Sequence, residues 1–426
     1  MNINVLLLGS GGREHALAWK IGQSPFLKRL YCAPGNPGTA TCGTNLPVDI
    51  SHFEDIKQLV QRYGISMVVV GPEEPLVRGI ADYFALDQEL SDCFVVGPGR
   101  AGARLEGSKD YAKSFMKRHH IPTSSYASFT AAQVEDAVAC IAKTKPPYVL
   151  KADGLAAGKG VVILSDLQEA EDALNAFFGG KFGEAGKRVV IEEYLSGIEL
   201  SVFILTDGKS YKILPQAKDY KRIGDGDQGP NTGGMGAVSP VPFADKAFME
   251  KVEKRIIIPT VTGLAKEGID YKGFMFIGLM NCNGDPYVIE YNVRLGDPEA
   301  EVVIPRIKSD LLAHLIGLSK GALSQEELQI IPEFALSVVM VSGGYPGTFE
   351  KGYTIEGLPS IKEGSLVFHA GTKRLNDTIV TSGGRVLAVT VRDPHLGEAR
   401  RKAYQLIDSI DFTGASYRKD IGMDLL

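Results

Sequence analysis

The sequence predicts a protein of several domains, in the α/β and α+β classes, that begins with a doubly wound parallel sheet. Its 426 residues exceed the ~150 residues of a typical single domain. Over roughly the first hundred residues, short apolar runs alternate with helix-like segments, which is the pattern of right-handed βαβ units. Shorter β-rich segments and glycine-rich loops replace this alternation further along the chain. The change of pattern indicates more than one folding unit.

Continuous apolar runs that end in glycine or alanine mark the strands of the first domain. Because these runs are apolar on both faces, they suit strands of a parallel sheet that helices cover on both sides. The predicted strands are 5–9, 30–33, 67–71 and 94–97, and the predicted helices are 14–23, 53–63 and 77–89. A basic amphipathic segment then ends at Ile121-Pro122, where the residue before proline disfavours helix. We place a domain junction at this segment and assign 1–108 to the first domain.

The rest of the chain divides into a central region, 109–330, and a C-terminal domain, 331–426. Short β-rich segments around a helix at 167–178 predict a small α+β cap lobe over about 123–197. A glycine-rich loop, 221–237, precedes a helix at 245–268, strands at 273–281 and 286–294, and a helix at 311–319. The remainder, 334–426, is typical of a separate αβ module with short strands and glycine turns.

Composition argues against several classes of protein. The net charge is −5, from 46 Lys and Arg against 51 Asp and Glu, so bulk positive charge cannot hold nucleic acid. No stretch approaches the ~18 to 20 apolar residues that cross a bilayer, and no basic segment precedes the first apolar run. Five cysteines without CxxC spacing favour reduced thiols over disulfides or a zinc site. We therefore expect a cytoplasmic protein with no nucleic-acid or membrane partner.

The segment GSGGREHA, residues 9–16, lies at the first strand-to-helix turn. Backbone N–H groups and the helix dipole at such a turn can bind a phosphate. Gly9 and Gly11 match the dinucleotide-binding fingerprint, but Glu14 occupies the third glycine position and no acid ends the second strand. These departures argue against a nicotinamide cofactor. Phosphate binding and a purely structural turn both stay open.

The segment KADGLAAGKG, residues 151–160, combines a lysine on a strand with a glycine-rich loop. Its spacing differs from that of a Walker A loop, and no Ser or Thr follows the second lysine. Glycines still let a backbone close over phosphates, and Lys151 can supply a point charge. A phosphate-binding loop and a plain hairpin both fit. The acidic strand end IEEYLSGIEL, 191–200, likewise fits either an adenosine contact or an ordinary surface.

The strand VIEYNVR, 288–294, carries the most informative pattern. Side chains alternate across a strand, so Glu290, Asn292 and Arg294 share one face. The same alternation predicts Ile289, Tyr291 and Val293 on the other face. A carboxylate and an amide are oxygen ligands of the kind that Mg²⁺ prefers, and an arginine beside them can grip a carboxylate or phosphate. The pattern favours a metal and phosphate site over a solvated sheet face.

Taken in order, these segments resemble the glycinamide ribonucleotide synthetases of the ATP-grasp superfamily, from about residue 5 to residue 422. The motifs are LEGSK (105–109), KADGLAAGKGV, IEEYLSG, PNTGGMGA (230–237), EYNVRLGDPE (290–299), GGYPG (343–347) and KDIG (419–422), together with GSGGREHA. The resemblance implies an ATP-grasp core with its cap lobe. It also implies a ligase of purine synthesis that uses ATP and Mg²⁺ or Mn²⁺ to join glycine to 5-phosphoribosylamine through glycyl phosphate.

The resemblance further assigns residues to ATP and to the metal. It places Lys109, Lys151 and the loop with Gly154, Gly158 and Gly160 at the phosphates, Glu192, Tyr194 and Leu195 at the adenine, Glu199 at the ribose, and Glu290 and Asn292 at the metal. The preceding strand reads Gly278-Leu279-Met280 where the wider superfamily often has another acidic ligand. Phosphate oxygens and water are therefore expected to complete the metal's ligands.

We add candidates for the two other substrates. Arg294 is the candidate clamp for the glycine carboxylate or the acyl phosphate, which makes Lys151, Glu290 and Arg294 the expected catalytic set. The glycine pocket is expected to use the loop with Asp219, Lys221, Thr232, Gly233 and Met235. The carboxyl ends of the first strands are expected to bind phosphoribosylamine, with Gly11, Gly12, Arg13, Glu14, Asn36 and Glu73.

Two alternatives stay open on the sequence. One is a different ATP-grasp carboxylate–amine ligase, or a biotin-dependent carboxylase subunit, with the same ATP machinery and another acceptor. The second is a regulatory protein that binds a nucleotide without catalysis. For the assembly we expect a monomer or a weak oligomer.

Overall fold

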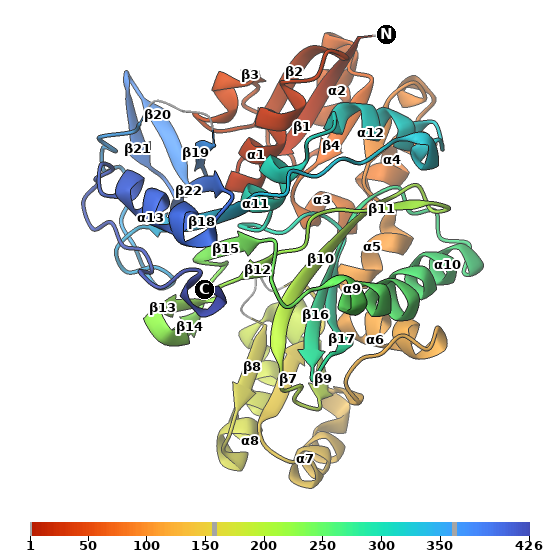
Figure 1. Cartoon of the computed structure of the whole chain (residues 1–426). Coiled ribbons are helices and arrows are strands. Elements are labelled where there is room, and N and C mark those ends of the chain that lie inside the picture. Colours follow the sequence, from red (N-terminus) through yellow and green to blue (C-terminus); the bar gives the residue numbers. More distant parts are fainter. Residues whose placement is uncertain (1, 156–159, 360–363) are drawn as a thin grey trace.

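The computed structural model describes residues 2–155, 160–359 and 364–426, which form four main β-sheets with helices packed against them (Figure 1). One sheet is parallel and the others are antiparallel, which confirms the predicted mixture of α/β and α+β domains. Within the described residues, no helix has the length and apolar character needed to cross a membrane.

The N-terminal sheet is parallel in every pairing, with the order β3-β2-β1-β4-β5. Its strands are β1 (Ile3–Gly9), β2 (Leu27–Pro34), β3 (Thr44–Asn45), β4 (Met67–Val70) and β5 (Phe94–Val96). The helices are α1 (Gly12–Ile21), α2 (Phe53–Tyr63), α3 (Glu73–Val77), α4 (Ile80–Leu86) and α5 (Arg100–Gly107). Alternate β1 residues enter two different cores, with Leu6 and Leu8 in one and Val5 and Leu7 in the other. This burial on both faces explains the continuous apolar runs.

One helix prediction in this domain was wrong. The segment 77–89, predicted as a single helix, is divided between the end of α3 and the whole of α4. Gly79 separates the two helices with a φ of 89°, a left-handed value that only glycine adopts without strain. The divided helix lets the chain turn over the carboxyl end of β4.

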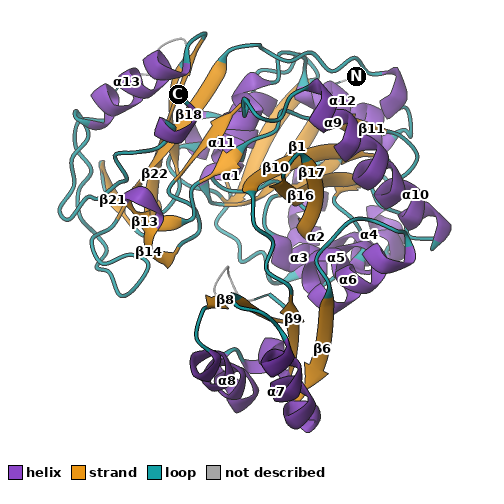
Figure 2. Cartoon of the chain, turned by 60° about the horizontal axis from the view of Figure 1, so that its bottom comes forward, coloured by secondary structure: helices purple, strands orange, loops and turns teal. Residues whose placement is uncertain are grey.

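The cap lobe projects from the rest of the molecule as a small antiparallel sheet with two helices (Figure 2). After α6 (Lys109–Arg118), its strands are β6 (Tyr126–Thr130), β7 (Tyr148–Ala152), β8 (Val161–Leu164) and β9 (Arg188–Glu192), in the order β6-β9-β7-β8. Helices α7 (Val134–Lys143) and α8 (Leu167–Ala176) pack on the sheet and bury Ile141, Leu150, Leu174 and Val189 with it. Strand β6 and helix α7 were not anticipated from the sequence.

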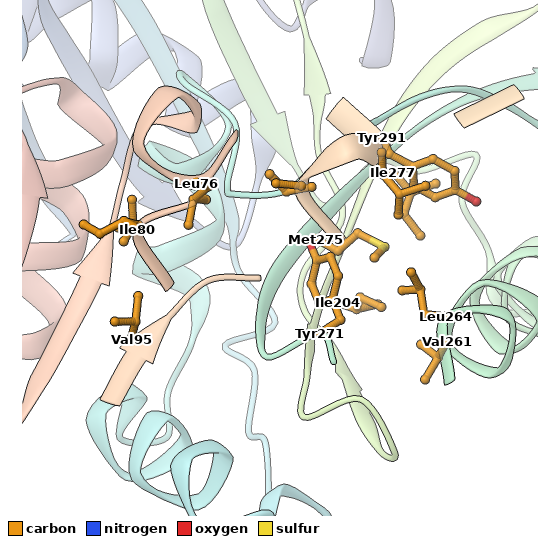
Figure 3. Close-up of a cluster of buried hydrophobic side chains, with 14 of the residues drawn as sticks. Leu76, Ile80, Val95, Ile204, Val261, Leu264, Tyr271, Met275, Ile277 and Tyr291 are labelled. Carbon is orange, nitrogen blue, oxygen red and sulfur yellow. The ribbon is translucent and has the colours of Figure 1, made fainter. Parts of the chain in front are cut away.

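The central sheet has the antiparallel order β11-β10-β16-β17. Its strands are β10 (Ile198–Thr206), β11 (Tyr211–Ile213), β16 (Gly273–Cys282) and β17 (Asp285–Asn292). Helices α9 (Lys246–Val252) and α10 (Ile258–Lys266), joined by a π-helical turn, form the predicted long helix, and α11 (Ala300–Val303) and α12 (Leu311–Ser319) follow β17. Figure 3 shows Ile204, Met275 and Tyr291 of this sheet near Val261 and Leu264 of α10.

A β-bulge at β17 changes the predicted alternation of side chains. Gly278 of β16 pairs with Glu290 and Leu279 pairs with Val288, so Ile289 has no direct partner. The apolar core therefore receives Val288, Tyr291 and Val293, and Ile289 does not join it. The prediction that Ile289 shares a face with Tyr291 and Val293 was wrong, because a bulge inserts one residue into the two-residue period.

The C-terminal sheet contains strands from two separate parts of the chain. Its order is β12-β15-β18-β22-β19, with β12 (Lys218–Asp219) and β15 (Gly236–Ser239) from the central region and β18 (Phe334–Val341), β19 (Ser365–His369) and β22 (Arg385–Asp393) from the C-terminal region. Helix α13 (Leu396–Ile407) packs on it, and β13 (Arg222–Gly224) with β14 (Gln228–Asn231) and β20 (Thr372–Leu375) with β21 (Thr378–Thr381) form two ribbons. The sequence pattern indicated a separate C-terminal module. In the structure this module shares a sheet with β12 and β15, which flank the glycine-rich loop.

The first prediction concerns the contact between the N-terminal and central sheets. A Cβ at Gly273 would lie 2.9 Å from backbone atoms of Gly97, whose N–H donates to Lys272 O at 2.8 Å. Because backbone cannot move aside as a side chain does, we expect Gly273→Ala to lower the free energy of unfolding by about 1–3 kcal/mol. Urea unfolding measures the change. The control is Gly179→Ala, where nothing lies within 4 Å of the added methyl group; equal stabilities of the two variants would contradict the prediction.

Candidate active site

A buried row of three charged side chains lies where the cap sheet meets α6. The Glu192 carboxylate at the end of β9 lies between two ammonium groups, with Lys113 Nζ 2.8 Å from Oε2 and Lys151 Nζ 2.9 Å from Oε1. Lys113 also donates to Thr123 and Ser124. Burial lowers the pKa of Lys113 to about 8, and Glu192 opposes that shift. Burial alone would raise the pKa of Glu192, but the two lysines outweigh it and lower the pKa, so the row keeps its charges.

The Glu192 side chain, which the resemblance placed at the adenine, is buried and its carboxylate pairs with Lys151. Lys151 also donates to Ile289 O, at 3.3 Å, which brings the cap strand β7 against the bulge of β17. Tyr194 and Leu195 follow β9 in the connection to β10, with Tyr194 exposed and Leu195 half-buried. The connection therefore keeps side chains available at the surface between the cap and the core.

A second lysine, Lys109, contacts the start of the glycine-rich loop 154–160. Lys109 Nζ donates to Gly154 O at 3.1 Å, and burial lowers the pKa of Lys109 while Glu290 opposes the shift. A Cβ at Gly154 would lie 2.9 Å from the Ala185 methyl, so this position needs a glycine. Gly160 lies at the far end of the loop, and Gly158 lies outside the described residues.

Glu290 and Asn292 lie side by side at the end of β17. The amide nitrogen of Asn292 is 3.5 Å from Glu290 Oε1. Burial would raise the pKa of Glu290, but Lys221, Lys151 and Lys109 outweigh it and lower the pKa, so an ionised carboxylate lies among three cations. In the part of the chain that the structure describes, no group of three His, Cys, Asp or Glu side chains could hold a metal. One carboxylate and one amide fit a cation that takes its other ligands from phosphate and water, as Mg²⁺ does.

Strand β12 and the start of the glycine-rich loop position Lys221, which is one of the three lysines near Glu290. Lys221 Nζ pairs with Glu199 Oε2 at 2.7 Å, and the pKa of Lys221 is raised well above its usual value because Glu199, Asp219 and Glu290 outweigh the effect of burial. Burial raises the pKa of Asp219 to about 7, with Lys221 opposing. The expected ribose ligand Glu199 and two of the expected glycine-pocket residues, Asp219 and Lys221, therefore form one cluster beside Glu290.

The rest of the loop is fixed by its own backbone and by the C-terminal sheet. Thr232 Oγ1 donates to Lys221 O at 2.8 Å, and the Gly233 N–H donates to the Tyr345 hydroxyl at 2.9 Å. Arg385 donates to Gly233 O. Met235 is fully buried in the core and its N–H donates to Tyr220 O, so its side chain anchors the loop. Of the five loop candidates, Met235 is the one that the structure removes from the surface.

Arg294 joins the central sheet to the N-terminal domain. Its guanidinium contacts Glu106 Oε1 at 2.7 Å and Glu73 Oε2 at 3.2 Å, and it donates to Leu295 O at 3.2 Å. Glu106 Oε2 also accepts the Val293 N–H at 2.7 Å. The expected clamp is thus already held by two carboxylates, and Glu73 comes to the site as its partner.

A cleft of about 410 Å³ opens at the carboxyl ends of β1 and β4, as expected for an open α/β sheet. It is lined by Gly9, Ser10, Gly11, Arg13, Glu14, Pro34, Val48, Asp49, Ile50, Pro72 and Asp297. Gly11 N–H donates to Glu14 Oε2 at 2.6 Å and Arg13 N–H donates to Asp297 Oδ2 at 3.3 Å. Two N–H groups at the start of α1 therefore bind carboxylates of the protein itself.

The remaining N-terminal candidates support this cleft from behind. Asn36 donates to Ser10 O at 2.9 Å and to His369 O at 2.8 Å, which ties the turn to the C-terminal sheet. A Cβ at Gly12 would lie 2.2 Å from Glu301 Oε1. Asn36 and Gly12 are buried and do not line the cleft.

Several residues at the site were missed by the sequence analysis. Lys113 lies in the amphipathic segment that we used only as a domain junction, and Glu106 lies inside the LEGSK motif. The GDPE turn that contains Asp297 was noted without a role. Arg385 lies on β22, more than 80 residues from Asp297, and only the tertiary structure brings it to the site.

Comparisons with known proteins identify the family. Three consecutive models match the chain, described as the N domain (residues 3–106), the ATP-grasp (A) domain (107–300) and the C domain (335–424) of phosphoribosylglycinamide synthetase. The chain belongs to the phosphoribosylglycinamide synthetase family. Among the curated relatives, the phosphoribosylamine–glycine ligase of Rhizobium meliloti is 47% identical over 420 residues, with 99% of this chain and 98% of that one covered. The Vibrio cholerae ligase is 45% identical over 425 residues, with the same coverage.

Solved structures agree with this membership. The crystal structure of phosphoribosylamine–glycine ligase from Thermotoga maritima matches with a TM-score of 0.85 and 38% identity, over 98% of this chain and all of that one. The biotin carboxylase domain of a Hydrogenobacter thermophilus 2-oxoglutarate carboxylase matches with a TM-score of 0.73 at 18% identity, over 98% of this chain and 92% of that one. The second likeness concerns the fold alone, and it confirms the ATP-grasp architecture.

The second prediction tests the charged row at Lys151. In Glu192→Gln, two buried ammonium groups lose their counter-charge, so we expect the free energy of unfolding to fall by about 3–5 kcal/mol. We also expect weaker ATP binding, because Lys151 loses the group that holds it. Urea unfolding and calorimetric titration with ATP measure the two effects. The control is Glu193→Gln, whose exposed side chain accepts a hydrogen bond from the Ser125 hydroxyl. A Glu192 variant as stable as this control would show that the two buried lysines do not need the Glu192 charge.

Proposed function

We propose that this chain is a ligase that forms a C–N bond: it joins glycine to 5-phosphoribosylamine, with ATP converted to ADP and phosphate, and makes glycinamide ribonucleotide for purine synthesis. The observation that carries this is the match of all three family domains, in order, to a chain that relatives named phosphoribosylamine–glycine ligase cover almost completely. The family uses ATP with a divalent cation. The match also favours this reaction over the alternatives, which are another ATP-grasp carboxylate–amine ligase, a biotin carboxylase-like enzyme and a non-catalytic nucleotide-binding protein.

ATP is proposed to bind between the cap lobe and the central sheet. Lys151 and Lys109 would meet the phosphates, and the loop from Gly154 to Gly160 would close over them with its backbone N–H groups. The connection with Tyr194 and Leu195 would line the adenine, with the Glu192 backbone at its start, and Glu199 would bind the ribose hydroxyls. The positions of these groups, around the buried Glu192 carboxylate and the end of β17, support the assignment.

The cation is proposed to be Mg²⁺ or Mn²⁺, held by Glu290 and Asn292. When bound, it would neutralise negative charge on the ATP phosphates. The nearby ammonium groups of Lys109, Lys151 and Lys221 already hold Glu290 in its ionised form. The site would therefore be ready to bind a cation without first losing a proton.

Glycine is proposed to bind near the loop with Asp219, Lys221, Thr232 and Gly233, beside the phosphates. Its carboxylate would attack the γ-phosphorus of ATP and give glycyl phosphate and ADP. Lys151 and Lys221 would offset the negative charge that develops on the transferred group. Arg294 would orient the acyl phosphate, which requires its guanidinium to shift from Glu73.

Phosphoribosylamine is proposed to bind in the N-terminal cleft at Gly11, Arg13 and Glu14. Its amine would attack the carbonyl carbon of glycyl phosphate, and phosphate would leave. Gly12, Asn36 and Glu73 would act from behind the cleft, by fixing the turn and Arg294. For the protein as a whole, we propose a cytoplasmic monomer or weak oligomer.

The third prediction tests the reaction itself. ADP release should require both glycine and phosphoribosylamine, because the acyl phosphate is formed from one and consumed by the other. A coupled assay of ADP with each substrate omitted in turn measures this requirement, and chelation followed by addition of Mg²⁺ or Mn²⁺ tests the metal. Turnover that depends on bicarbonate, or on another amino acid in place of glycine, would overturn the assignment.

The fourth prediction tests the cation site. Glu290→Ala should lower kcat by about 100-fold or more, because metal-assisted charge stabilisation contributes several kcal/mol. Circular dichroism should show an unchanged fold. The control is Asp285→Ala on the same strand, where the carboxylate pairs with Lys251 and Arg255 at the surface. Near-normal turnover in the Glu290 variant would show that the cation binds elsewhere.

A further inference from the structure

Asp297 lies where the proposed acceptor site meets the rest of the active site. Among the described residues that line the N-terminal cleft, Asp297 alone comes from outside residues 1–108. It follows β17 by five residues and its side chain is 15% exposed, so the carboxylate reaches the cleft from the central domain. A Cβ at Gly11 would lie 3.0 Å from Asp297 Oδ2, which shows how closely the carboxylate approaches the turn.

The two oxygens of this carboxylate have different surroundings. Oδ1 lies 3.0 Å from Arg385 Nη2, whose guanidinium also donates to Asp297 O at 2.7 Å and to Gly233 O. Oδ2 accepts a long hydrogen bond, 3.3 Å, from the Arg13 N–H, and the Glu301 carboxyl group also hydrogen-bonds the Asp297 side chain. A carboxylate oxygen can accept more than one hydrogen bond, so Oδ2 keeps capacity for a donor in the cleft. Because Arg385 contacts both the Asp297 carboxylate and Gly233 O, it connects Asp297 to the loop of the proposed glycine pocket.

Four charged groups face Asp297 from the elements around it. They are Arg13 from α1, Arg385 from β22, and Glu299 and Glu301 from the start of α11. Burial would raise the pKa of Asp297, but Arg385 and Arg13 outweigh it and lower the pKa. Burial and Asp297 together raise the pKa of Glu301 well above its usual value. Of the two carboxyl groups of Asp297 and Glu301, that of Asp297 therefore carries the negative charge, and Asp297 is the one that lines the cleft.

We propose that Asp297 accepts the proton that the amine of phosphoribosylamine loses when it attacks glycyl phosphate. This inference rests on the proposed function. The amine nitrogen forms a bond to the carbonyl carbon, the bond from that carbon to the phosphate oxygen breaks, and phosphate leaves with the electron pair. One proton passes from the nitrogen to Asp297 Oδ2, and the product is a neutral amide. A carboxylate that lines the cleft can hydrogen-bond the amine and accept this proton as the nitrogen releases it.

The test separates the two halves of the reaction in the full-length enzyme. Hydroxylamine attacks acyl phosphates in water without a catalyst, so with ATP and glycine it should trap glycyl phosphate as glycine hydroxamate and need no help from Asp297. In Asp297→Asn we expect ligation to phosphoribosylamine to fall by about 100-fold or more, the size of a general-base contribution. Hydroxamate formation should stay within about threefold of wild type. An equal loss in both reactions, or ligation at the wild-type rate, would overturn the proposal.

A second variant distinguishes proton transfer from a structural role. Arg385→Gln removes the ion pair with Asp297 but keeps the carboxylate in the cleft. If Asp297 served only to hold Arg385, this variant would copy the selective loss of ligation seen in Asp297→Asn, and the proposal would fail. We expect Arg385→Gln to retain at least about tenfold more ligation than Asp297→Asn, and Asp297→Glu to recover part of the rate. Failure of the wild-type enzyme to form either product would instead reject the proposed function.

Discussion

The cost of burying charge determines how this molecule is assembled around its site. An isolated charged side chain is expensive to remove from water, and Glu192 and Glu290 at the site each have lysines nearby. Glu192 lies between Lys113 and Lys151 inside the cap, and Glu290 lies near three lysines from different elements. Because each partner comes from another segment, satisfying the charges also sets the positions of the cap, the central sheet and the loop.

The segment from Glu290 to Glu301 is where these requirements meet. It begins with the proposed cation ligands, continues with Arg294, which pairs with Glu73 and Glu106 of the N-terminal domain, and reaches Asp297, which pairs with Arg385 of the C-terminal sheet. One short stretch of chain therefore contacts three domains. This segment connects the proposed ATP site, the proposed glycine loop and the proposed acceptor cleft, which would help to orient the substrates of a two-step transfer.

The sequence predicted most of the fold because the signals were local. Continuous apolar runs gave the parallel strands, and the face shared by Glu290 and Asn292 was predicted from the alternation of a single strand. The parts it did not predict depend on partners far along the chain. The bulge at Ile289 follows from its pairing with β16, the shared C-terminal sheet joins β15 to β18, and Arg385 reaches Asp297 only in the folded chain. No pattern within one segment records these contacts.

The glycines of the first turn also have contacts that the local sequence pattern does not reveal. The pattern at residues 9–12 left phosphate binding and a purely structural turn both open, and in the structure the Glu14 carboxylate lies among these glycines. A Cβ at Gly9 or Gly71 would lie within 2.6 Å of Glu14 side-chain atoms, and one at Gly11 would lie 2.8 Å from Glu14 Oε2. The glycines are needed because Glu14 lies among them and holds the Gly11 N–H. A turn occupied in this way suits a ligand that donates hydrogen bonds, such as ribose hydroxyls or an amine, and the acidic lining contributed by Asp49 and Asp297 favours the same kind of ligand.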